Sequence, residues 1–128
     1  MSARLRTPLA KIEGLGSAKA GTLHFWHQRM TAVALIPLSI WFAASALAFV
    51  GADQGAVAAY FAEPINAVPM FLFIVASTYH MSLGLQIIIE DYFHNEGQKI
   101  AFLLLNRFAA WAIGAASAFA LVRMALHP

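Results

Sequence analysis

Residues 67–89 read AVPMFLFIVASTYHMSLGLQIII, an uncharged apolar run that holds a single ionisable side chain, His80. A helix needs roughly 20 apolar residues to cross the hydrocarbon core of a bilayer. Residues 30–50 and 100–126 are two further stretches that are long and apolar enough. The sequence therefore predicts an all-α integral membrane protein with three transmembrane helices.

The composition excludes most classes of soluble protein. Of the 128 residues, 61% are apolar and 11% are charged, and the mean hydropathy is +0.70. Soluble domains carry about 25% charged residues, so a soluble enzyme, a disordered tail and a nucleic-acid-binding module are all excluded. The chain has no cysteine and so offers no thiolate ligand for zinc or for an iron–sulfur cluster.

Two regions follow from the position of the first span: an N-terminal arm, residues 1–29, and a transmembrane domain, residues 30–126. The arm lacks the apolar core of a signal peptide, and Gly14, Gly16 and Gly21 interrupt any long helix in it. We therefore expect a partly irregular arm. The loop 90–99 is short, which predicts that the second and third spans are antiparallel neighbours.

The distribution of charge predicts the orientation in the membrane. No basic residue lies in the loop 51–66, whereas the loop 90–99 ends on Lys99. Because cytoplasmic segments are enriched in Lys and Arg, we expect the N-terminus and the loop 90–99 in the cytoplasm. The loop 51–66 and the C-terminus are then on the periplasmic side of a bacterial inner membrane. The basic residues up to the start of the first span are Arg4, Arg6, Lys11, Lys19 and Arg29.

His80 is the main candidate for a functional residue. An ionisable group near the middle of a span is costly in the bilayer, and its default interpretation is functional. One interpretation is that its imidazole ligates a metal-bound cofactor. The other is that it only forms a hydrogen bond, to Ser77, to Thr78 or to a partner chain. The residues alone leave both open.

Four further residues extend this candidate site. Gly84 lies one turn further along the same helical face, where a missing side chain admits a flat cofactor or another helix. Asp91 falls on that face where the helix meets the headgroups. The neighbouring Tyr92 is either an aromatic anchor at the interface or a hydrogen-bond donor to a quinone carbonyl. Arg29, at the same level, is either an anchor or a partner for a propionate, a quinone oxygen or Asp91.

Together these residues resemble the hydrophobic membrane anchor subunit of bacterial and mitochondrial succinate dehydrogenase, in particular its smaller, D-type form, a cytochrome b556 anchor. The resemblance rests on His-Met-Ser-Leu-Gly at 80–84, Asp-Tyr at 91–92 and Arg-Met-Thr-Ala at 29–32. It extends over nearly the whole chain after residue 22.

The resemblance implies a role for each of these residues. His80 would be one axial ligand of a haem b, and the companion cytochrome b anchor subunit would supply the other. Tyr92 would donate a hydrogen bond to ubiquinone, with Asp91 beside the quinone pocket and Arg29 near the haem propionates. FAD and the iron–sulfur clusters would lie in the flavoprotein and iron–sulfur subunits.

The sequence therefore predicts an anchor of succinate:ubiquinone oxidoreductase (respiratory complex II) in a multi-subunit helical bundle surrounded by lipid. The chain is not catalytic alone. Two alternatives stay open, a small transporter that uses His80 as a protonatable carrier and a purely structural anchor in which His80 is not a ligand.

Overall fold

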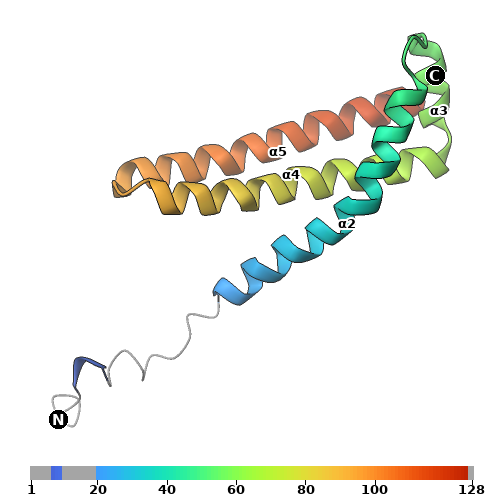
Figure 1. Ribbon diagram of the computed structural model, residues 1–128. Coiled ribbons are helices and arrows are strands. Elements are labelled where there is room, and N and C mark those ends of the chain that lie inside the picture. Colours follow the sequence, from blue (N-terminus) through green and yellow to red (C-terminus); the bar gives the residue numbers. More distant parts are fainter. Residues whose placement is uncertain (1–6, 10–19, 127–128) are drawn as a thin grey trace.

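The computed structural model describes residues 7–9 and 20–126, and every regular element within these ranges is a helix (Figure 1). Three of the helices are long and apolar enough to cross a membrane. The predicted all-α fold with three spans is confirmed. In chain order the helices are α2 (Ala20–Ala48), α3 (Gln54–Ala62), α4 (Pro64–Tyr92) and α5 (Glu96–Leu126), of which α3 is the short one.

The three spanning helices are longer than the apolar runs that predicted them. The largest difference is at α2, which begins at Ala20 rather than at residue 30. Gly21 lies in the first turn, where it does not interrupt the helix, and the polar and aromatic residues 24–29 continue it. Of the predicted N-terminal arm, residues 1–6 and 10–19 lie outside the described residues, and with them Arg4, Arg6, Lys11 and Lys19.

The loop predicted at 51–66 contains the helix α3. Asp53 caps its first turn, because the side-chain Oδ1 accepts a hydrogen bond from the backbone N–H of Ala56 at 2.7 Å. Ala58 and Phe61 are buried where α3 packs on α4 and α5. This helix was not predicted from the sequence because it is short and lies between two longer apolar segments.

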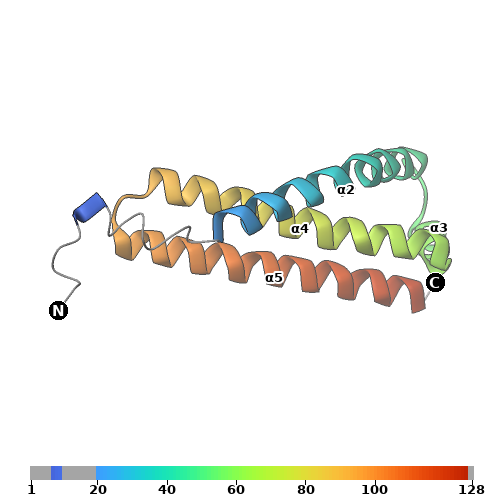
Figure 2. The same ribbon diagram turned by 90° about the horizontal axis from the view of Figure 1, so that it is seen from below.

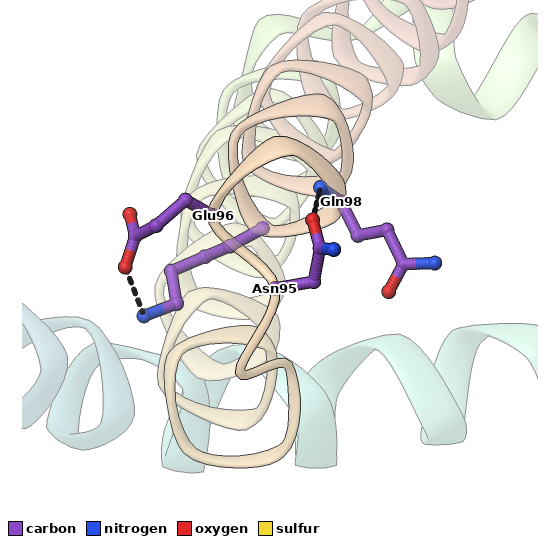
Figure 3. A network of polar contacts seen from close by, with 4 residues as sticks. Asn95, Glu96 and Gln98 are labelled. Carbon is purple, nitrogen blue, oxygen red and sulfur yellow. Dashed lines mark hydrogen bonds and ion pairs between the residues drawn. The ribbon is translucent and has the colours of Figure 1, made fainter.

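α4 and α5 form an antiparallel pair that both ribbon views show side by side (Figures 1 and 2). The turn between them ends on Asn95, whose Oδ1 accepts a hydrogen bond from the backbone N–H of Gln98 at 3.2 Å. Glu96 and Lys99 form an ion pair at 3.8 Å in the same turn (Figure 3). An acidic residue in the first turn also stabilises a helix, because its negative charge interacts favourably with the helix dipole.

Small and polar residues hold α4 and α5 together inside the membrane-spanning part. Gly114 faces Thr78 so closely that a Cβ built on it would lie 3.3 Å from the Thr78 Oγ1. Nearer the turn, the side-chain Nδ2 of Asn106 donates to the carbonyl of Ser82 at 2.9 Å. Glycine contacts and interhelical hydrogen bonds of this kind are the usual means of packing helices in lipid.

α2 contacts α4 but not α5 among the described residues. Figure 1 shows it crossing α4 and bending near its middle, where Pro37 lies inside the helix. A proline there removes one backbone hydrogen bond and kinks the helix. The stacked rings of Phe42 and Phe73, 4.6 Å between centroids, join α2 to α4 beyond the bend.

Candidate functional site

His80 lies in the middle of α4 on the side that faces α2. The rise from His80 to Tyr92 is about 18 Å at 1.5 Å per residue, which is deep inside a bilayer. The ring borders a groove of about 410 Å³ between the two helices. The other lining residues are Gly21, His24, Phe25, Gln28, Arg29, Ala32 and Ile87.

The hydrogen-bond partner of His80 comes from the neighbouring helix. Its Nδ1 lies 2.9 Å from the hydroxyl Oγ1 of Thr31 on α2. The two partners proposed from the sequence, Ser77 and Thr78, instead donate their hydroxyl hydrogens to the backbone carbonyl of Ile74, at 3.1 and 2.7 Å. Among the described residues none forms a hydrogen bond to the other ring nitrogen of His80, Nε2.

The α2 wall of the groove presents polar atoms that are buried without partners. The Nε2 of His24 and the Oε1 of Gln28 are both buried, and neither has a hydrogen-bond partner in the described part of the chain. Gly84 on α4 faces Gln28, because a Cβ built on this glycine would meet only the Nε2 of Gln28, at 3.6 Å. Buried polar atoms of this kind require a partner, so the groove is suited to a ligand with polar groups.

Arg29 borders the same groove but is not paired with Asp91. Its guanidinium carbon lies 5.2 Å from the centre of the Phe25 ring, in a cation–π arrangement on one face of α2. In the described part of the chain the only ion pair is the one between Glu96 and Lys99.

Asp91 and Tyr92 lie outside the groove, at the end of α4. Both are exposed, and the Tyr92 side chain has 77% of its surface free. The groove therefore brings His80 and Arg29 together, Gly84 faces Gln28 on α2, and Asp91 and Tyr92 are exposed outside the groove.

A second histidine also joins α2 to α4. The Nδ1 of His27 lies 2.6 Å from the phenol oxygen of Tyr79, and the two rings are 5.8 Å apart. This contact lies next to the one between Thr31 and His80, since Tyr79 directly precedes His80 in the chain.

Three residues of the site were given no role in it from the sequence: Thr31, His24 and Gln28. Their polar side chains in the first half of an apolar helix were the available signal. Which of them face His80 depends on how α2 is rotated about its axis relative to α4, and the sequence pattern does not predict this rotation.

Comparison with known proteins supports one family. A family described as the succinate dehydrogenase/fumarate reductase transmembrane subunit matches residues 3–114, a range that includes every residue of the groove and Tyr92. The chain belongs to this family.

The relatives carry matching names. The succinate dehydrogenase hydrophobic membrane anchor subunit of Paracoccus denitrificans is 37% identical over 96% of this chain and 95% of its own length. The protein of that name in Rickettsia bellii is 36% identical over 72% of this chain and 74% of its own. A succinate dehydrogenase membrane anchor subunit of Reclinomonas americana is 30% identical over 72% of this chain and 79% of its own. No solved structure matches the chain.

Proposed function

We propose that this chain is the membrane anchor subunit of a succinate:ubiquinone oxidoreductase, and that it shares the ligation of a haem b and part of the ubiquinone site. The observation that carries the proposal is His80, a mid-membrane histidine of an anchor family, with one ring nitrogen hydrogen-bonded and the other without a partner in the described part of the chain. In this function the chain positions cofactors and substrate, while the flavoprotein and iron–sulfur subunits oxidise succinate.

The residues around the groove fit a haem. Among the described residues no group of three or more His, Asp or Glu side chains could hold a bare metal ion. His80 alone can hold an iron only if a porphyrin and a second chain complete the coordination. The missing side chain at Gly84, the guanidinium of Arg29 and the polar atoms of α2 that have no partner in the described chain suit a flat ring with acidic substituents. When bound, haem supplies a one-electron redox centre inside the membrane.

Tyr92 is proposed to donate a hydrogen bond to a ubiquinone carbonyl. Its phenol is exposed at the end of α4, at the level where a quinone headgroup meets the membrane surface. The carboxylate of Asp91, also exposed, can exchange with water the protons that quinone reduction consumes. The rest of the quinone pocket would come from the companion anchor and the iron–sulfur subunit.

The extent of exposed apolar surface supports a companion chain. No residue of the most apolar window of α2 is buried within this chain. We propose that the companion cytochrome b anchor subunit packs on this surface, with lipid around the rest. The orientation that we propose has the N-terminus in the cytoplasm and the C-terminus in the periplasm.

The test of the proposed function is a spectrum of the purified complex. After reduction with dithionite, the complex should show the absorption bands of a low-spin b-type haem, and His80→Ala should abolish or shift them. His27→Ala, a second histidine of the α2–α4 contact, is the matched control and should leave the bands unchanged. An unshifted spectrum in the His80→Ala complex would contradict haem ligation and favour a purely structural anchor.

A further inference from the structure

The hydrogen bond between His80 and Thr31 has a consequence for how the histidine binds iron. A neutral imidazole carries one proton on one of its two nitrogens. If Nε2 of His80 binds iron, as the proposed function requires, the proton is on Nδ1 and needs an acceptor. In an apolar span an unpaired N–H is costly, because neither water nor lipid can accept its hydrogen bond.

Thr31 can be that acceptor because its own hydroxyl proton has another hydrogen-bond acceptor. A hydroxyl donates one hydrogen bond and accepts two. The Oγ1 of Thr31 lies 2.8 Å from the carbonyl oxygen of His27 and 3.1 Å from that of Gln28, and both oxygens can only accept. When the hydroxyl donates its proton to one of these carbonyl oxygens, its lone pairs are free to accept the Nδ1–H of His80. The Oγ1 and Nδ1 atoms are 2.9 Å apart.

No other described group competes for this proton. His80 has no second hydrogen bond in the described part of the chain. Among the described residues no carboxylate lines the groove. The nearest acid on the same face of α4, Asp91, lies about 16 Å further along the helix at 1.5 Å per residue.

We propose that Thr31 is the positioning residue of the haem ligand: its hydroxyl accepts the Nδ1 proton of His80, fixes the tautomer with Nε2 free and sets the orientation of the ring. This inference rests on the proposed function. Partners of this kind fix the orientation of metal-bound histidines and raise their basicity, which stabilises the ferric state.

The test compares Thr31→Val and Thr31→Ser in the purified complex, by redox titration of the haem and by electron paramagnetic resonance of its ferric form. Valine keeps the shape of threonine and removes the hydroxyl, so Thr31→Val should raise the haem midpoint potential, change the ferric signal and weaken haem retention about tenfold. Thr31→Ser keeps the hydroxyl and should therefore keep the midpoint potential, the ferric signal and the haem retention of the wild type.

The matched control is Tyr79→Phe. It removes the other hydrogen bond between α2 and α4, from the residue next to His80, and does not touch the His80 ring. Tyr79→Phe should leave the potential and the ferric signal as in the wild type.

Two results would overturn the role of Thr31 while leaving the proposed function intact. The first is an unshifted potential in Thr31→Val, and the second is an equal shift in Thr31→Val and Tyr79→Phe, which would mean that any loss of contact between the helices has this effect. A wild-type complex without haem bands would overturn the proposed function, and the role of Thr31 with it.

Discussion

At the scale of single residues, the site depends on how each polar atom in an apolar span is satisfied. The Nδ1 of His80 is hydrogen-bonded by a threonine whose hydroxyl also bonds its own helix. The Nε2 has no partner in the described chain, and the nearby His24 and Gln28 each carry one buried unsatisfied atom. Unsatisfied polar atoms are costly in a membrane, so their concentration around one groove supports the ligand that we propose there.

The phenol of Tyr92 allows a prediction about quinone reduction. Tyr92→Phe removes one hydroxyl from an exposed side chain, so the fold should be unaffected. Loss of one hydrogen bond of about 0.5–1.5 kcal/mol should lower the rate of quinone reduction roughly two- to tenfold. Succinate oxidation with an artificial acceptor should be unchanged, and the two assays on the same complex measure the difference.

Tyr60→Phe is the control for Tyr92→Phe. The phenol of Tyr60 lies near the other end of α4, where it hydrogen-bonds Ser45 at 3.2 Å, far from the proposed quinone site. This variant should leave both assays unchanged. Equal losses in the two assays for Tyr92→Phe would count against a contact with quinone.

The residues that could be predicted from sequence are those of α4. His80 and Gly84 share a face by helical spacing alone, and in the structure His80 borders the groove while Gly84 faces Gln28 on α2. Thr31, His24 and Gln28 could not be assigned, because they face His80 only through the packing of two helices that are far apart in sequence.

At the scale of the elements, α4 is the central helix. It packs against α2, α3 and α5, whereas α2 and α5 make no contact with each other in the described chain. The sequence predicted α4 and α5 as antiparallel neighbours from the short loop between them. It did not predict α3, because the signal for that helix is a single cap, Asp53, ahead of nine residues.

The contact between α4 and α5 predicts a graded response at Gly114. A Cβ at this position lies 3.3 Å from the Thr78 Oγ1, so Gly114→Ala requires a shift of a few tenths of an ångström. Gly114→Leu requires the helices to separate, and overpacking of this kind typically costs about 1–3 kcal/mol. Thermal unfolding of the purified complex, followed by circular dichroism, should show a small decrease in melting temperature for Gly114→Ala and a larger one for Gly114→Leu.

Ala115→Leu adds a comparable side chain to the next residue of α5, which is exposed in this chain. It should lower the melting temperature much less than Gly114→Leu. Equal losses at the two positions would mean that the close approach of Gly114 to Thr78 does not hold the pair together.

At the scale of the whole molecule, the chain is a set of three spans with little interior of its own. Among the described residues no large side chain is fully buried, and the groove at His80 is bordered by α2 and α4 alone. This explains why the composition predicted a membrane protein so directly. In most soluble proteins the apolar side chains form a buried core, whereas here they are on the surface. Their coverage requires lipid and a partner chain.

The proposed orientation can be tested on the intact chain because it contains no cysteine. Five basic residues up to the start of the first span, and none in residues 51–66, favour an N-terminus in the cytoplasm. Ala52→Cys, between α2 and α3, and His94→Cys, between α4 and α5, each introduce one exposed thiol in a segment that connects two helices. In whole cells with a permeabilised outer membrane, a membrane-impermeant maleimide should label Ala52→Cys, and it should label His94→Cys only after the inner membrane is opened. The reverse pattern would invert the orientation and move Tyr92 and Asp91 to the periplasmic side, away from the subunits that would deliver electrons to quinone.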